Sequence, residues 1–198
     1  MGRYGCFFAT LCFVAICFTG PFVTLAVMEP LSTEELVNNS TCIVIGKVAD
    51  KYSAWSADGR KIVTRYRVEV DETVAGTDPG KIVEVEHDGG IVGETGLDVS
   101  DVPAMDTNAT VLLFLQAPRH SRTLIRPAQA SPGAFFAVTG HAQGRYTIAA
   151  DGIARKDGFT VLASGARIDA ELSLMGLRTL IKRLWSGRNT PGDILKTP

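Results

Sequence analysis

Three histidines and one aspartate are the residues whose chemistry could support hydrolysis or metal binding. His87, His120 and His141 lie in three separate segments, without the paired helix or hairpin spacing that is typical of a zinc site. His87 is followed directly by Asp88, but neighbouring residues of a strand point to opposite faces. The pattern therefore favours a surface histidine beside a turn aspartate over an acid–base unit.

A second candidate is an acidic group made of Asp98, Asp101 and Asp106, because carboxylates are ligands for hard cations. It lacks the glycine and the terminal glutamate of a helix-loop-helix calcium site. The chain also has no serine in a nucleophile elbow and no glycine loop that cradles phosphates. We therefore expect a solvated acidic loop, no metal site and no cofactor.

Only one cysteine lies outside the apolar N-terminal segment, which we describe below as a signal peptide. Cys6, Cys12 and Cys17 lie in an apolar N-terminal segment, which leaves only Cys42, and one cysteine cannot form an internal disulfide. Cys42 opens an apolar run, so we expect a small buried apolar residue. The alternative is a nucleophilic or intermolecular thiol.

Aromatic, glycine and amide residues are the candidates for a binding surface. Trp55 stands in an expected loop, and residues 88–96 contain four glycines, which allow bends or close approach of another backbone. We expect this glycine-rich loop, together with Trp55, to be the most exposed surface. The residues predicted to bind are Trp55, Gly89, Gly90, Gly93 and Gln143.

An aromatic and basic patch is a further option for an extended ligand, since barrels often bind such ligands on one face. Its members would be Tyr52, Trp55, Arg65 and Arg67. A tryptophan in a loop commonly caps a barrel end, however, and the two arginines face strands rich in glutamate. The structural interpretation of these residues is therefore favoured.

The net charge excludes one class of partner. The chain has 20 Lys and Arg against 21 Asp and Glu, and Arg3 is the only charged residue before residue 27, so the mature chain has a formal charge of −2. This leaves no basic excess to hold a phosphate backbone. We expect no nucleic-acid ligand.

The N-terminal segment has the layout of a secretory signal peptide. Residues 1–5 carry one positive charge, residues 6–18 are apolar or small, and a Gly-Pro pair then breaks the run. Cleavage after Ala26 fits the small residues near that bond. The alternative is an uncleaved anchor, because residues 6–27 are long enough to cross a bilayer of about 30 Å. Either way we expect a secreted or periplasmic protein, with membrane contact only through this segment.

Hydrophobic periodicity predicts mostly strands. Residues 62–71 alternate between apolar and charged side chains, which is typical of an antiparallel sheet with one solvated face. Residues 81–87 repeat this alternation, and we expect the two segments to form a hairpin. Residues 50–60 are expected to be a loop. Further strands are expected at residues 42–48, 111–115, 135–140, 145–149 and 153–156.

Two helices are expected to flank these strands. Ser32 and Glu35 form a capping-box signature that opens a helix of about two turns. Ser173 is also a favourable N-cap, and after it leucines and isoleucine recur at helical spacing, which predicts an amphipathic helix in the C-terminal segment at residues 168–186. We expect it to pack on its own domain, the alternative being a docking helix for a second protein. Residues 187–198 are expected to be a flexible tail.

These elements predict a mainly β fold of the α+β kind. Uneven strands, glycine-rich connections and a terminal helix favour a small antiparallel Greek-key or OB-like barrel over a helical or doubly wound fold. The barrel would occupy residues 29–160, with the short helix at its start and the amphipathic helix after it.

Four segments carry a resemblance to known proteins: residues 31–37, 43–48, 68–76 and 143–146. They resemble an uncharacterised family of secreted prokaryotic proteins over most of residues 31–150. Their order is also similar to the OB-type barrel of tissue inhibitors of metalloproteinases, which implies an extracellular barrel. Those inhibitors chelate the zinc of the protease with an amino-terminal cysteine. Because Cys42 is internal, no inhibitory residue carries over.

The sequence therefore predicts an exported, non-catalytic binding module whose ligand is a protein partner. The alternative hypothesis is an exported metal-dependent hydrolase that uses His87, His141 and nearby carboxylates. It has no workable catalytic geometry in its favour at the level of sequence.

Overall fold

The computed structural model describes residues 30–56, 58–99, 102, 104–116, 135–156 and 171–188. The expected signal peptide or anchor, nearly all of the expected tail, His120 and Asp101 lie outside these residues. Within the described ranges, no helix is long and apolar enough to span a membrane.

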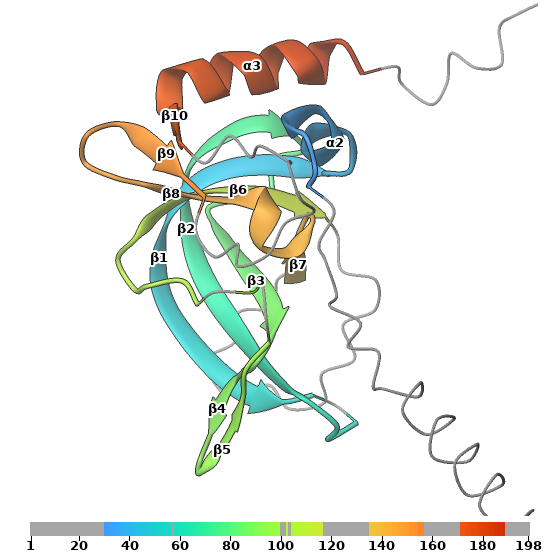
Figure 1. Ribbon diagram of the computed structural model, residues 1–198, viewed down its shortest axis with the longest axis vertical. Coiled ribbons are helices and arrows are strands. Elements are labelled where there is room, and N and C mark those ends of the chain that lie inside the picture. Colours follow the sequence, from blue (N-terminus) through green and yellow to red (C-terminus); the bar gives the residue numbers. More distant parts are fainter. Residues whose placement is uncertain are drawn as a thin grey trace, which may run out of the picture.

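The described residues are mainly β, as the sequence predicted (Figure 1). The helical elements are α2 (Thr33–Asn38), the 3-10 helix η1 (His141–Gly144) and α3 (Leu174–Ser186). The strands are β1 (Cys42–Trp55), β2 (Ile62–Gly76), β3 (Ile82–Asp88), β4 (Gly90–Val92), β5 (Thr95–Leu97), β6 (Thr110–Gln116), β7 (Phe135–Val138), β8 (Arg145–Ile148), β9 (Ile153–Arg155) and β10 (Glu171–Ser173).

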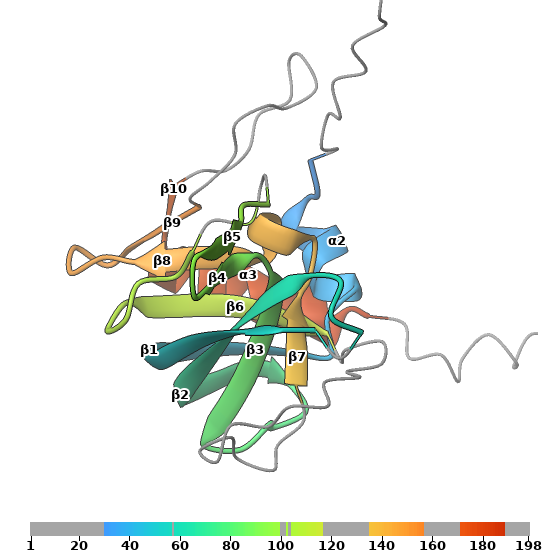
Figure 2. The ribbon, with the colours of Figure 1, turned by 90° about the horizontal axis from the view of Figure 1, so that it is seen from below.

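The strand pairings form one large sheet whose order returns to its first strand. The order is β1-β2-β3-β7-β6-β8-β9-β10, and β6 also pairs with β1. The expected hairpin is confirmed, because β2 and β3 pair antiparallel along β3. The expectation of a wholly antiparallel sheet is wrong at one place, since β3 and β7 are parallel where Glu84 faces Phe135 (Figure 2).

Each face of the sheet has its own apolar core. On one face, alternating residues of β1, β2, β3 and β6 pack together around Val44, Tyr66, Val85 and Leu113. On the other face, Ile43 and Phe114 pack with residues of both α-helices. The alternation that predicted the strands therefore separates two cores.

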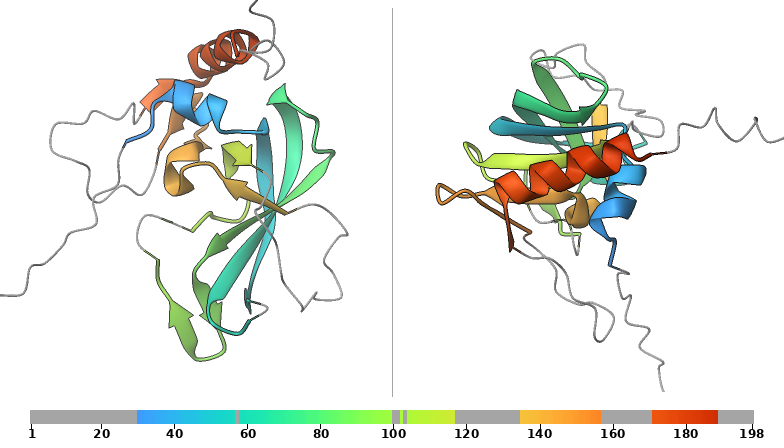
Figure 3. Two further views of the ribbon diagram at one scale, coloured as in Figure 1. Left: turned by 90° about the vertical axis from the view of Figure 1, so that its right-hand side faces the viewer. Right: turned by 90° about the horizontal axis from the view of Figure 1, so that it is seen from above.

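The helices close the second core, and α3 lies across α2 and the sheet (Figure 3). Leu177 and Ile181 of α3 are fully buried, which confirms that this helix packs on its own domain. Burial of each such side chain stabilises the fold by roughly 1.5–3 kcal/mol. Both predicted caps are also present: Ser32 and Glu35 form the capping box, and Ser173 caps α3.

Two segments differ from the expectation at the end of the molecule away from α3. Residues 50–55 were expected in a loop but continue β1, because the 15-residue strand β2 pairs with β1 as far as Trp55 and Ile62. The glycine-rich loop expected at residues 88–96 contains a small hairpin, β4–β5.

Candidate binding surface

The end of β1, the start of β2 and the hairpin β4–β5 form one end of the molecule (Figure 1). Pairing between β1 and β6 stops at Lys47, whereas pairing between β1 and β2 continues to Trp55. The amide of Gly89 donates to the carbonyl of Ile62 over 2.8 Å, which ties the start of the hairpin to β2. The hairpin is thus held beside the strand ends.

Two of the predicted binding glycines have a structural part in placing the hairpin. Gly90 has φ +133, and a Cβ there would overlap the hydroxyls of Thr64 and Ser53. The Thr64 hydroxyl donates to the carbonyl of Gly89 over 2.6 Å and lies 2.8 Å from the Ser53 hydroxyl. Only glycine fits so close to this pair. Their part in binding stays a prediction.

Three exposed apolar side chains belong to the strands at this end. Ile91 is 72% exposed, Trp55 38% and Leu97 37%. Among the described residues, the other large exposed hydrophobic side chains are Ile82, at the start of β3, and Met175 on α3. We call Trp55, Ile91 and Leu97 the hairpin-end surface. The exposed Gly93, which has open space around it, lies in the turn between β4 and β5.

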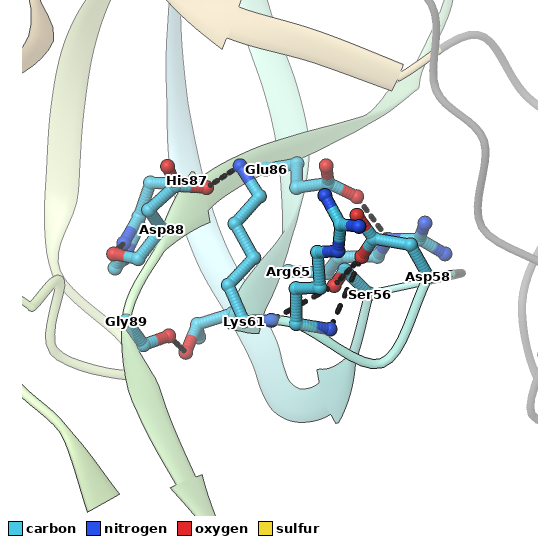
Figure 4. Close-up of polar contacts among 10 residues, drawn as sticks. Ser56, Asp58, Lys61, Arg65, Glu86, His87, Asp88 and Gly89 are labelled. Carbon is cyan, nitrogen blue, oxygen red and sulfur yellow. Dashed lines mark hydrogen bonds and ion pairs between the residues drawn. The ribbon is translucent and has the colours of Figure 1, made fainter.

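Charged side chains lie around this surface, and some of them form polar contacts with each other (Figure 4). Lys61 reaches from the β1–β2 turn to Asp88 at the end of β3, with 2.6 Å between Nζ and the carboxylate. A hydrogen bond from Ser56 lowers the pKa of Asp58, which therefore stays ionised. Glu94 and Asp98 are exposed on the hairpin side.

The predicted aromatic and basic patch does not form an exposed patch. The side chain of Arg65 is only 2% exposed, because its guanidinium lies 3.9 Å from the ring centroid of Phe135 and 2.8 Å from Glu86. Burial alone would lower the pKa of Arg65, and hydrogen bonds with Tyr52 and Glu86 raise it above its ordinary value. Arg65 is therefore a buried structural cation. Arg67 is half-buried.

Gln143 lies apart from the other predicted binding residues. It belongs to η1, is 3% exposed, and its Oε1 accepts a hydrogen bond from the amide of Leu31 over 2.6 Å. Gly140 packs against the same leucine. Gln143 therefore ties the segment before α2 to η1, and the structure does not bring it to the hairpin-end surface (Figure 1).

His87 is held by hydrogen bonds on both ring nitrogens. Nε2 lies 2.8 Å from the hydroxyl of Tyr66, and Nδ1 lies 2.8 Å from the carbonyl oxygen of Asp88. The two rings stack with centroids 4.9 Å apart. Burial is the main cause that lowers the pKa of His87, so the ring is neutral at neutral pH. This is a half-buried histidine rather than the expected surface one.

The remaining metal candidates are not brought together. His141 is exposed at the start of η1. Asp98, just after β5, and Asp106, before β6, are also exposed. Across the described ranges, no three His, Cys, Asp or Glu side chains are grouped in a way that could hold a metal ion.

No protein-family model matches this chain, and no curated protein matches it.

Cys42 is buried, as expected. It is 1% exposed in the core beside Val44, and burial raises the pKa of its thiol. A neutral, inaccessible thiol is a poor nucleophile. The expectation of a small buried apolar residue is confirmed.

Sequence reasoning missed the apolar side chains of the hairpin, Ile91 and Leu97. One signal could have found them, because Gly93 and Glu94 form a two-residue connection between extended residues, a common pattern for a tight hairpin. No pattern in the neighbouring sequence predicts that His87 contacts Tyr66. The two residues lie on neighbouring strands whose register the sequence alone does not give.

Proposed function

We propose that this protein is an exported, non-catalytic binding module that docks a protein partner through the hairpin-end surface. The observation that carries the proposal is the exposure of Trp55, Ile91 and Leu97 at one end of the molecule. A tryptophan beside aliphatic side chains is a common composition for the centre of a protein interface.

The acidic rim supports a protein partner over nucleic acid or an anionic lipid surface. Asp58, Glu94 and Asp98 are exposed around the apolar centre, where the exposed cations are Arg60, beside Asp58, and Lys61, which is paired with Asp88. Acidic side chains therefore outnumber basic ones there. Such a rim repels phosphate-rich ligands and favours a partner with basic side chains around an apolar contact. The partner's matching surface is therefore apolar at its centre and basic at its edge.

We further propose that the strands form an OB-type barrel. Two features support this: the pairings pass from β1 through β2, β3, β7 and β6 back to β1, and the β3–β7 pair is parallel. The core around Tyr66 and Leu113 would then be the barrel interior. In such barrels, loops at the ends of strands supply ligand contacts.

Export is the third part of the proposal, and it rests on the signal-peptide pattern of residues 1–26. The mature protein would be secreted or periplasmic, or remain tethered if the segment is not cleaved. Amino-terminal sequencing of the protein from its source distinguishes these: a start near residue 27 supports cleavage, and a start at Met1 supports an anchor.

The hydrolase alternative gains no support from the site. Both ring nitrogens of His87 are engaged by Tyr66 and Asp88, and His141 stands on a separate element. The binding proposal is therefore favoured over hydrolysis.

The test is quantitative affinity capture of the mature chain from the extracytoplasmic fraction of its source. Ile91→Asp places a charge in the middle of the proposed contact, and Met175→Asp is the matched control, because Met175 is 78% exposed on α3 at the other end of the molecule. We expect one stoichiometric partner to be retained by the wild type and by Met175→Asp and to be lost with Ile91→Asp. A partner retained equally by all three proteins would refute this surface.

A further inference from the structure

Hydrogen bonds join the Met105 amide, the Tyr66 hydroxyl and the half-buried ring of His87. The amide of Met105 donates to the Tyr66 hydroxyl over 3.3 Å, and that hydroxyl lies 2.8 Å from Nε2 of His87. Tyr66 is 1% exposed and Met105 4% exposed, both in the core around Val68. The chain therefore links β2 and β3 to the segment before β6.

The geometry fixes the protonation state of His87. Nδ1 faces the carbonyl of Asp88, which can only accept, so Nδ1 carries the proton. Nε2 must then accept from the Tyr66 hydroxyl, and the hydroxyl oxygen remains free to accept from Met105. With His87 neutral, all three bonds form and the Tyr66 hydroxyl hydrogen also has its acceptor.

A proton on Nε2 disrupts this arrangement. Nε2 would become a donor toward Tyr66, and the hydroxyl hydrogen would lose its acceptor in a buried site. To regain an acceptor the hydroxyl has to turn, and turning its hydrogen toward Met105 competes with the bond from the Met105 amide. Arg145 of β8 also lies close enough for its positive charge to disfavour a charged His87, whereas Glu86 and Asp88 of β3 favour it. Burial is the largest cause, and together these effects lower the pKa of His87. Asp106 and Arg145 also act on Tyr66, with opposite signs.

The Tyr66 bond is one of the contacts that hold residues 104–109 on the sheet. Arg145 Nη1 donates to the carbonyl of Ala104 over 3.3 Å, and Lys51 Nζ donates to that of Met105 over 3.4 Å. At the other end of the segment, the amide of Asn108 donates to the carbonyl of Val48 over 2.7 Å. These bonds are independent of His87, whereas the Tyr66 bond seats the Met105 side chain in the core.

We propose that His87 and Tyr66 form an acid-sensitive latch: protonation of His87 weakens the Tyr66 bond to Met105 and lets residues 104–109 open from the sheet. The latch is independent of the hairpin-end surface and goes beyond the proposed binding function. An exported protein meets a wider range of pH than a cytosolic one, so a histidine device of this kind has a setting in which to act.

The sign of the effect follows from the lowered pKa. Above the ordinary histidine pKa of about 6.5, His87 is neutral in the closed and the open segment, and the latch is fully effective. As the pH falls below about 6.5, the open form takes up a proton that the closed form resists. Opening is then favoured by about tenfold per pH unit until the pH reaches the lower pKa of the closed form.

The test is hydrogen exchange at single amides between pH 7.5 and pH 5.0, corrected for the intrinsic exchange rate. We expect the protection of the Met105 amide to fall by about threefold or more over this range. Protection of the Leu113 amide, in the core strand β6, should stay unchanged over the same range. NMR titration of the His87 ring in the folded wild type should give a pKa below the ordinary histidine value, so Met105 protection should begin to fall at a higher pH than the ring itself takes up its proton.

His87→Gln supplies the matched variant, since glutamine can accept from Tyr66 and does not titrate. Met105 protection in this variant should be independent of pH, whereas His141→Gln, which removes an exposed histidine, should behave as the wild type. Equal pH dependence in the wild type and His87→Gln would overturn the latch. So would a His87 titration in the folded wild type without any change at Met105, a result that needs no variant to fold.

Discussion

At the scale of single residues, Gly90 limits how the hairpin can be attached. Gly90→Ala combines a disfavoured φ of +133 with overlap of the Thr64 and Ser53 hydroxyls, so we expect a loss of roughly 2–3 kcal/mol in the free energy of unfolding. Gly93→Ala is the control: its φ is also positive, at +60, but nothing lies within 4 Å, and the expected loss is about 1 kcal/mol. Urea unfolding measures both, and equal losses would contradict this account.

Arg65 is a buried cation that depends on one carboxylate. Glu86→Ala removes the partner of the 2%-exposed Arg65 side chain, and we expect a loss of roughly 1–3 kcal/mol, reduced by the partial exposure of Glu86. Asp151→Asn, in the exposed pair with Arg155, is the control and should leave the unfolding midpoint unchanged. Thermal unfolding distinguishes the two, and an unchanged midpoint for Glu86→Ala would show that Phe135 and Tyr52 suffice for Arg65.

Arg65 also marks a limit of residue-level prediction. Its place in the alternation predicted correctly that it lies on the opposite face from Tyr66, but that face was expected to be solvated. The residue that covers Arg65, Phe135, lies far along the chain and reaches it through the parallel pairing of β7 with β3. No local pattern contains this contact. Cys42, by contrast, lies within an apolar run, and its burial followed from its neighbours.

At the scale of elements, α3 should stabilise the domain through a narrow apolar face. Leu177 is 1% exposed in the core shared with α2 and the sheet, so Leu177→Ala should cost roughly 2–5 kcal/mol. Met175→Ala, two residues earlier on the same helix, should change the free energy of unfolding by less than about 0.5 kcal/mol, since its side chain is 78% exposed. Chemical denaturation followed by circular dichroism measures both. Similar effects would mean that α3 is not docked as described.

Elements with a strong local signal were predicted well, and those defined by their partners were not. The capping box of α2, the N-cap of α3 and the strand alternation of β2 are all local and were confirmed. The second half of β1 contains Ser53, which favoured a loop, and it is a strand only because β2 pairs with it. The hairpin β4–β5 was hidden because its glycines also fit a bent loop.

At the scale of the whole molecule, the two ends differ in what covers them. Helices α2 and α3 cover one end, and the hairpin-end surface lies at the other (Figure 1). The sequence predicted that a glycine-rich loop and Trp55 belong to one surface, and their shared location agrees with that grouping. It could not exclude Gln143, because only the fold shows that this side chain is buried beside Leu31.

The central claim, that a protein partner docks on the hairpin-end surface, is tested most directly by photo-crosslinking in the source cells. A photoreactive amino acid is placed at Ile91 and, in a second protein, at Met175, two exposed positions at opposite ends of the molecule. We predict a single crosslinked species of higher mass from position 91 and none from position 175. Crosslinks to the same protein from position 175 alone, or none from position 91, would contradict it.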